Sequence, residues 1–149
     1  MAKKKLARFA EILDFDNVVQ AGYDEVFNRK HNLHGKWTEE FFRSDGPVVI
    51  ELGCGKGEYT VGLARMFPEI NFVGVDIKGS RLWKGAKYAY ENKMQNVGFL
   101  RTRIEFIPSF FDSEEIEQIW LTFPDPQLKK SRKRLTSAGF LNRYRKFLR

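Results

Sequence analysis

The chain has 149 residues, of which 42% are hydrophobic and 30% charged, and its formal net charge at pH 7 is +7. This length gives one domain with a real core, and the hydrophobic content excludes a disordered chain. No apolar run is long enough to cross a membrane, and the lysine-rich start lacks the apolar segment of a signal peptide. The single cysteine, Cys54, cannot form an internal disulfide, so a reduced, cytoplasmic protein is expected. No membrane partner is expected, and the sequence is compatible with a monomer or a homodimer.

Positive charge is concentrated toward the end of the chain. Residues 126–149 carry nine Lys or Arg and no acid, which leaves 17 basic and 19 acidic residues elsewhere, a net charge of −2. Such asymmetry indicates a polyanionic partner. A solvated basic helix on an ordinary surface is the alternative that charge alone leaves open.

The first 46 residues show no clear hydrophobic period and are predicted to be an N-terminal extension that packs on or beside the core. Within them, residues 14–22 are expected to form a loop. His31 and His34 are three residues apart, but no other histidine and few carboxylates accompany them. No metal site is therefore expected.

From residue 47 onward, the pattern alternates between strands and helices. Strands are predicted at residues 47–52, 71–76, 96–100 and 117–123, and helices at residues 58–67, 80–94 and 137–148, with a helical turn at residues 104–111. The predicted inward face of the first of these helices comprises Tyr59, Leu63 and Phe67, with Val61 or Ala64 beside them. This order predicts an α/β fold, a Rossmann-like parallel sheet with helices on both faces and ligands at the carboxyl ends of its strands.

A glycine-rich turn follows the first of these strands. Residues 48–58 read Val-Val-Ile-Glu-Leu-Gly-Cys-Gly-Lys-Gly-Glu, with Gly53, Gly55 and Gly57 at alternate positions, which predicts a buried strand, a tight turn and a helix start. Asp76 ends the next apolar run. That spacing suits a nucleotide site in which a carboxylate accepts both ribose hydroxyls.

Acidic residues around this turn distinguish between two cofactors. A dinucleotide places its pyrophosphate at the helix N-terminus, where Glu58 would repel it. S-adenosylmethionine has no phosphate but carries an ammonium and a sulfonium, and Glu51 is predicted to face the same pocket. The sequence therefore favours S-adenosylmethionine over NAD; the alternative for Glu51 is a structural group that binds loop amides.

Pro124, Asp125 and Pro126 follow the fourth predicted strand. Two prolines fix the backbone on either side of one acid, which could accept hydrogen bonds from N1 and N2 of guanine. Guanine N7 already has a free lone pair, so the chemistry needs orientation and relief of the positive charge that methylation creates. A proline-rich turn with a capping Asp is the alternative.

The basic run at residues 129–134 comes directly after this loop. It contains Lys129, Lys130, Arg132 and Arg134. Beside a pocket mouth, these side chains would hold phosphates of an RNA while one base enters the pocket.

These motifs resemble the bacterial tRNA (guanine-N7)-methyltransferases. The matching stretches are Gly53-Cys54-Gly55-Lys56-Gly57, Phe72-Val73-Gly74-Val75-Asp76-Ile77, Phe123-Pro124-Asp125-Pro126, Lys129-Lys130 and Lys133-Arg134-Leu135-Thr136. The similarity covers about residues 45–148, and residues 6–15 also resemble the start of the family. The Phe-Pro-Asp-Pro motif is specific, whereas the glycine turn alone would indicate only a class I methyltransferase.

The resemblance implies methyl transfer from S-adenosylmethionine to N7 of a guanosine in the variable loop of tRNA, on a class I methyltransferase fold. Carried over by position, it implies Glu51 and Asp76 for the cofactor, Asp125 as the catalytic or guanine-binding acid, and Lys129 for tRNA. The predicted site also includes Gly53, Gly55, Gly57, Ile77 and Arg103 at the cofactor, and Lys130, Arg132 and Arg134 at the tRNA. Two positions depart from the family pattern. Gln127 replaces a Trp that could stack, and Arg103 replaces an acid near the adenine, where backbone groups of residues 102–104 would serve instead.

Length is the larger departure. Family members continue beyond the helix at residues 137–148 with further strands, so residues 47–149 are predicted to be a partial methyltransferase domain with four of seven strands. The outer edge of the fourth strand is then expected to be unpaired. We expect weak cofactor binding and little or no methyl transfer by this chain alone. Two other functions remain as alternatives: a methyltransferase acting on a nucleobase amino group, and a non-catalytic RNA-binding module with a retained nucleotide fold.

Overall fold

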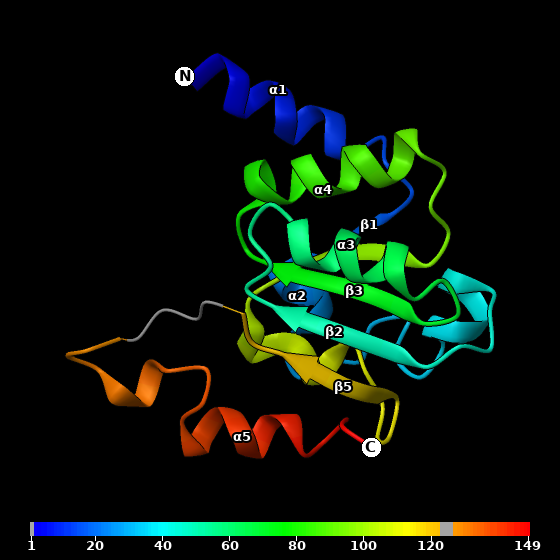
Figure 1. The fold of residues 1–149 in the computed structure, drawn as a ribbon. Helices are drawn as coiled ribbons and strands as arrows, with labels where there is room; N and C mark the ends of the chain where they lie inside the picture. Colours follow the sequence, from blue (N-terminus) through cyan, green and yellow to red (C-terminus); the bar gives the residue numbers. More distant parts are fainter. Residues whose placement is uncertain (1, 123–126) are drawn as a thin grey trace.

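A computed structural model describes residues 2–122 and 127–149 (Figure 1). They form a five-stranded parallel sheet in the order β1-β4-β3-β2-β5. The strands are β1 (Val18–Gln20), β2 (Val48–Leu52), β3 (Asn71–Asp76), β4 (Val97–Arg101) and β5 (Ile116–Trp120). The helices are α1 (Ala2–Ile12), α2 (Tyr23–Val26), the π-helix η1 (Trp37–Phe42), α3 (Glu58–Met66), α4 (Gly79–Glu91), the 3₁₀ helices η2 (Ile104–Ser109) and η3 (Ser131–Lys133), and α5 (Ala138–Tyr144). The predicted α/β class and Rossmann-like parallel sheet are confirmed.

Both faces of the sheet are covered. Successive side chains of a strand point to opposite faces, so Ile50 and Leu52 pack in one hydrophobic cluster and Val49 in the other. Helices α1, α3 and α4 cover one face, and α2, η1, η2 and α5 cover the other (Figure 1). The central strands are buried on both sides, which explains their continuous apolar sequences.

The loop predicted at residues 14–22 is wrong, because it contains β1. This strand pairs in parallel with β4, with Val18 opposite Phe99 and Gln20 opposite Arg101. Three residues are too few for the alternating pattern that identifies a strand. The first 46 residues therefore supply an edge strand, and they also supply Trp37, whose fully buried indole donates to the Phe110 carbonyl oxygen at 2.8 Å. The domain division at residue 46 stays a prediction.

The predicted inward face of α3 is only partly confirmed. Val61 and Ala64 are buried, together with Thr60, whereas Tyr59 and Phe67 are 49% and 40% exposed. The rotation of α3 is set where it begins. Gly57, its N-cap, is in the left-handed conformation and packs closely against the Phe99 ring of β4.

The outer edge of β5 is paired at its start. The Ile116 N–H donates to the Phe147 carbonyl oxygen at 3.0 Å, and the Arg149 N–H donates to the Ile116 carbonyl oxygen at 2.7 Å. The expectation of an unpaired edge is therefore corrected at Ile116, because the chain returns beside β5 after α5.

Gly57→Ala is expected to lower the free energy of unfolding by about 3 kcal/mol. Gly57 has a φ of 73°, and a Cβ there would lie 2.6 Å from Phe99 Cε1. The left-handed backbone and the overpacking each contribute to this cost. Gly55→Ala is the matched control, because Gly55 has a φ of 57° but a Cβ would meet nothing within 4 Å. Its expected cost is about 1 kcal/mol, from the backbone alone. Urea unfolding measures both, and equal losses would contradict the packing role of Gly57.

Candidate active site

The turn after β2 is tied to the end of β3 by backbone hydrogen bonds. The N–H groups of Gly53 and Cys54 donate to the Val75 carbonyl oxygen at 2.8 and 3.0 Å. Gly53 and Gly55 both have positive φ, 69° and 57°, which only glycine adopts without strain. Among the described residues, no atom lies within 4 Å of a Cβ placed at Gly55, so this part of the turn is open backbone. We call residues 53–57 the glycine cradle.

Asp76, the last residue of β3, holds the glycine cradle in place. Its Oδ2 accepts from the Gly55 N–H at 2.9 Å, and its Oδ1 accepts from the Lys78 N–H at 2.9 Å. Each carboxylate oxygen can accept a second hydrogen bond, so both remain able to bind a pair of hydroxyl groups. The loop-amide role that was the alternative for Glu51 is thus performed by Asp76.

Glu51 is a buried carboxylate of β2 with an incomplete set of partners. Its side chain is 4% exposed, and the Thr60 hydroxyl lies 3.4 Å from Oε1. Within the described residues, Oε2 is buried without a hydrogen-bond partner. Burial raises the pKa of Glu51 above its ordinary value, and the hydroxyls of Thr122 and Thr60 partly oppose this effect. A buried acid with one unused oxygen suits a cationic ligand group.

This pKa shift predicts how stability depends on pH. Because the pKa of Glu51 is raised in the folded chain, the folded state holds more protons between the unfolded and folded pKa values, and the free energy of unfolding falls as pH rises through that range. Glu51→Gln removes this loss, so without ligand its Tm should fall less than that of the parent chain as the pH rises through that range. Glu69→Gln, at an exposed position before β3, is the control for removing one carboxylate. A Glu51→Gln profile parallel to that of the parent chain would contradict the assignment.

Cys54 lies inside the cradle but is not a nucleophile. Burial first, and then the charges of Asp76 and Glu51, raise the pKa of the Cys54 thiol well above its ordinary value. The group is therefore a neutral thiol at physiological pH, and its chemistry is that of a small apolar side chain.

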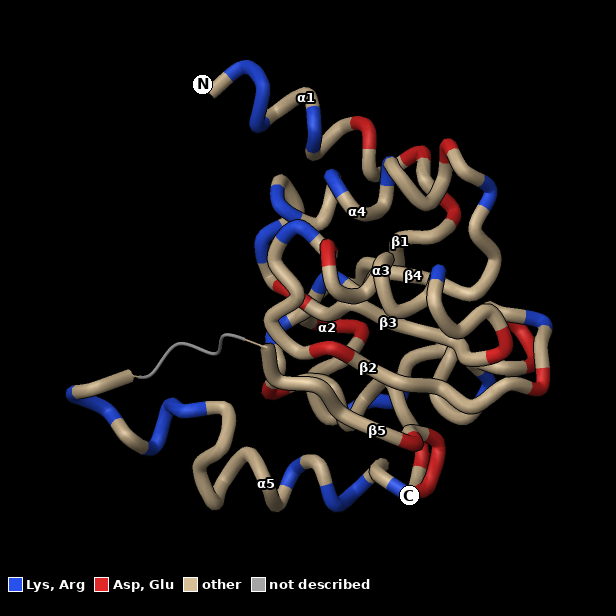
Figure 2. Tube along the Cα trace, in the orientation of Figure 1, with Lys and Arg blue, Asp and Glu red and all other residues tan. Residues whose placement is uncertain are grey.

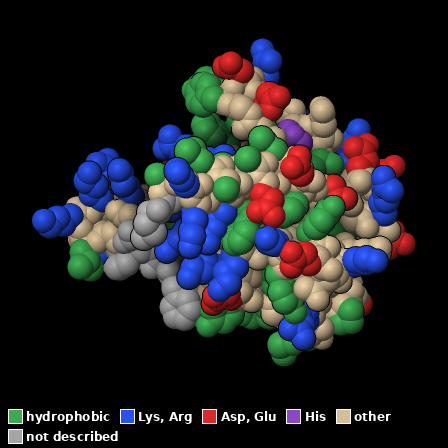
Figure 3. Space-filling model, turned by 90° about the horizontal axis from the view of Figure 1, so that it is seen from above, with side chains coloured by type: hydrophobic (Ala, Val, Ile, Leu, Met, Phe, Trp, Pro, Cys, Tyr) green, Lys and Arg blue, Asp and Glu red, His purple; other side chains and the backbone are tan. Residues whose placement is uncertain are grey.

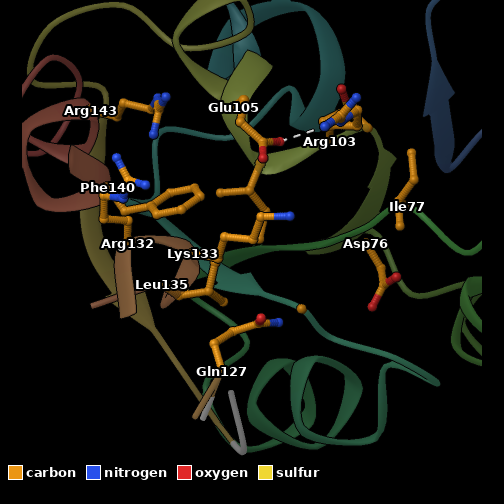
Figure 4. Close-up of a pocket in the computed structure, with 13 residues that line it drawn as sticks. Asp76, Ile77, Arg103, Glu105, Gln127, Arg132, Lys133, Leu135, Phe140 and Arg143 are labelled. Carbon is orange, nitrogen blue, oxygen red and sulfur yellow. Dashed lines mark ion pairs between the residues drawn. The ribbon is translucent and has the colours of Figure 1, made fainter. Parts of the chain in front are cut away.

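The main cavity lies at the carboxyl edge of the sheet and has a volume of about 740 Å³ (Figure 4). Asp76 and Ile77 face it from the end of β3, and the C-terminal segment faces it from the opposite side. Arg103 lies above it in an ion pair with Glu105, at 3.5 Å. The residues around it are Gly53, Asp76, Ile77, Thr102, Arg103, Ile104, Glu105, Gln127, Arg132, Lys133, Leu135, Phe140 and Arg143.

A second cavity of about 330 Å³ lies on the other side of Gly53. It is bounded by Glu51, Gly53, Cys54, Gly55, Lys56, Glu58, Tyr59, Arg81 and Thr122. The two cavities share Gly53, so an elongated ligand across the glycine cradle would reach Asp76 at one end and Glu51 at the other.

The structure brings together most of the residues predicted for the cofactor. Gly53, Asp76, Ile77 and Arg103 line the main cavity, and Glu51, Gly53 and Gly55 line the second. Gly57 lines neither of these cavities and packs on Phe99 instead. The cofactor-binding roles themselves stay predictions.

The residues predicted for catalysis and tRNA are placed less completely. Asp125 lies outside the described residues. Arg132 lines the main cavity, whereas Lys129, Lys130 and Arg134 are not among its lining residues. Their roles also stay predictions.

Three residues of the C-terminal segment, Leu135, Phe140 and Arg143, were not predicted at the site. They enter the main cavity together with Lys133 of the predicted basic run, because this segment lies across the carboxyl edge of the sheet. Leu135 Cδ1 lies 4.0 Å from a Cβ placed at Gly53. The sequence placed the segment at the site only by its charge, and no local pattern predicted its apolar contact with the cradle.

Comparisons with known proteins agree with this geometry. Residues 45–149 match a family model described as "Putative methyltransferase". A tRNA (guanine-N(7)-)-methyltransferase of Bacteroides fragilis is 55% identical over 148 residues, covering 99% of this chain and 59% of the relative. The protein of the same name from Christiangramia forsetii is 51% identical, covering 99% of this chain and 67% of the relative. The chain belongs to the tRNA (guanine-N7)-methyltransferase family. It spans about three-fifths of the length of the Bacteroides fragilis member.

Solved structures support the fold assignment of this family member. "Structure of an antibiotic related Methyltransferase" matches with a TM-score of 0.62 and 22% identity, over 74% of this chain and 57% of that one. The 16S rRNA methyltransferase KamB matches with a TM-score of 0.61 and 23% identity, over 74% and 52%. The sheet is therefore part of a Rossmann-like methyltransferase fold.

The described part of the chain contains neither a membrane-spanning helix nor a group of metal-binding side chains. No helix in residues 2–122 and 127–149 has the length and apolar character needed to span a membrane. In the same ranges, no group of three or more His, Cys, Asp or Glu side chains is arranged to hold a metal ion.

Proposed function

We propose that this chain forms the cofactor-binding part of an enzyme that transfers a methyl group from S-adenosylmethionine to N7 of a guanosine in tRNA, in the variable loop. The observation that carries the proposal is the pair of acids at the two ends of the glycine cradle, Glu51 and Asp76, each beside one of two adjoining cavities. Membership of the family supports the substrate and the methylated atom.

The residues present fit this cofactor. The unpartnered Oε2 of Glu51 suits an α-ammonium group, and the two oxygens of Asp76 suit the ribose hydroxyls. Gly55 leaves the space above the turn open, and Ile77, 50% exposed, offers an apolar surface to the base. When bound, S-adenosylmethionine supplies an electrophilic methyl group on a sulfonium. Glu58 beside the cradle disfavours a pyrophosphate, and hence NAD.

The chain's own residues would contribute orientation rather than proton transfer. Guanine N7 is unprotonated at neutral pH, so no general base is required to activate it. Asp125 is proposed to accept hydrogen bonds from N1 and N2 and to ease the positive charge that develops on the base. Holding N7 at near-attack distance from the methyl group accounts for the remaining acceleration. Lys129, Lys130, Arg132 and Arg134 would bind RNA phosphates beside the pocket.

Isothermal titration calorimetry tests the cofactor assignment. The chain is expected to bind S-adenosylmethionine and its demethylated product, but not NAD. NAD carries a pyrophosphate, which the acids beside the cradle would repel, whereas the other two ligands carry no phosphate. Absence of binding at millimolar S-adenosylmethionine would favour the non-catalytic RNA-binding module. Binding of NAD in preference would reject the proposal.

A further inference from the structure

Basic side chains outside the C-terminal segment gather at the carboxyl edge of the sheet. The turns and helix starts that follow β2, β3 and β4 carry Lys56, Lys78, Arg81, Arg101 and Arg103. The loops that lead into strands at the opposite edge carry acids: Asp16, Asp45, Glu69, Glu114 and Glu115. Figure 2 shows blue segments where the chain leaves β2 and β3 and begins α4, and red segments where it enters β2, β3 and β5. These basic side chains lie among the acids Glu51, Glu58, Asp76 and Glu105 at the same edge, and the net charge of residues 1–125 is −2.

Three of these side chains are exposed and form no ion pair with a carboxylate of the described residues. We call Lys56, Lys78 and Arg81 the α4 bank; all three are exposed. Within the described residues, no carboxylate lies within 4.0 Å of their charged groups. By contrast, Arg101 donates to Gln20 and to the Ile77 carbonyl oxygen, and Arg103 is paired with Glu105.

The α4 bank and the C-terminal segment lie on two sides of the glycine cradle. Lys56 and Arg81 border the second cavity, whereas Arg132, Lys133 and Arg143 border the main cavity, and the two cavities meet at Gly53. In Figure 3, Lys and Arg side chains gather on the left of the view, while acidic side chains lie mainly over its centre and right.

We propose that the α4 bank is a second phosphate-binding surface for RNA, so that the RNA backbone crosses the carboxyl edge between the α4 bank and the C-terminal segment. This inference rests on the proposed function, which supplies the RNA. A nucleotide presented to a pocket must leave its stack, and anchoring the phosphates on both sides of it holds it in that position. The acids that flank the glycine cradle, Glu51, Glu58 and Asp76, repel phosphate, which confines the backbone to the two basic rims. Arg81 offers a two-pronged donor for a phosphate, and the two lysines act as point charges.

The test compares two double variants that remove equal charge. Lys78→Gln with Arg81→Gln removes two of the three charges of the α4 bank and leaves Lys56, which also lies in the glycine cradle, intact. Arg43→Gln with Lys93→Gln is the control, at exposed positions before β2 and β4 on the opposite edge. Fluorescence anisotropy with a labelled tRNA transcript gives the affinity of each over a range of salt concentrations. The α4-bank variant should bind about tenfold more weakly at about 0.1 M salt, with a salt slope shallower by about 1.5, and the control should change by less than about twofold.

Two parallel measurements separate the possible failures. If neutralising Lys129, Lys130 and Arg132 weakens tRNA binding while the α4-bank variant binds like the control, the α4-bank proposal is overturned and the proposed function stands. If neither variant changes tRNA affinity, both fail. Titration of the single variant Lys78→Gln, a residue that lines neither cavity, should give the same affinity for S-adenosylmethionine as the parent chain. Loss of cofactor binding by the double variant with an unchanged salt slope would assign Arg81 to the cofactor carboxylate and overturn the RNA role.

Discussion

Asp76→Ala is expected to raise the Kd for S-adenosylmethionine by about two orders of magnitude. Two hydrogen bonds to a charged carboxylate, each worth about 1.5 kcal/mol, account for about 3 kcal/mol. The substitution also removes the carboxylate that accepts hydrogen bonds from the Gly55 and Lys78 N–H groups, each at 2.9 Å. Without these tethers, the glycine cradle loses its attachment to β3 through Gly55. Calorimetric titration of the variant measures the loss.

The matched control is Asp45→Ala, which removes an exposed carboxylate at the opposite edge of the sheet. It should bind S-adenosylmethionine as the parent chain does. Asp76→Asn separates the two roles of the residue, because an amide keeps one acceptor oxygen but replaces the other by a donor. We expect it to bind between the parent chain and Asp76→Ala. Parent-like affinity of Asp76→Ala would remove Asp76 from the cofactor site.

Asp125→Ala is expected to lower kcat for tRNA methylation by about three orders of magnitude with little change in cofactor affinity. On the proposed function, this side chain orients guanine and offsets charge that appears only as N7 is methylated. Its loss should therefore reduce kcat and kcat/KM together. The assay uses a fusion that joins this chain to the remainder of the Bacteroides fragilis relative, since the chain spans 59% of that protein.

Asp112→Ala, a substitution in the turn before β5, is the control for this measurement. It should leave kcat unchanged. Calorimetry with S-adenosylmethionine on the Asp125→Ala variant distinguishes a catalytic loss from a collapsed site. A variant that keeps its kcat but loses cofactor affinity would place Asp125 in cofactor binding rather than in catalysis.

The sequence predicted the parts of the site that are continuous along the chain. The strand, glycine turn and helix at residues 48–66, and the second strand ending at Asp76, each carry their own local pattern, and the structure has β2, α3 and β3 there. The meeting of the glycine turn with Asp76 could also be predicted, because the carboxyl ends of neighbouring parallel strands lie at one edge.

Features that depend on distant contacts could not be predicted. β1 is a strand because β4 offers it an edge, and the buried face of α3 is set by the packing of Gly57 against Phe99. The clustering of basic side chains in the α4 bank could not be predicted for the same reason. Lys56 and Arg81 are 25 positions apart in the sequence. They border one cavity because the turn after β2 lies beside the start of α4.

The central claim is that the glycine cradle directs a methyl group to N7 of guanine in tRNA. The most direct measurement incubates the fusion with tRNA and S-adenosylmethionine, then applies borohydride reduction and aniline cleavage, which break the RNA at N7-methylguanosine. We expect cleavage at one guanosine in the variable loop, and far less cleavage at subsaturating S-adenosylmethionine when the fusion carries Asp76→Ala. Methylated tRNA that resists cleavage, with the methyl group on a nucleobase amino group by mass spectrometry, would contradict it.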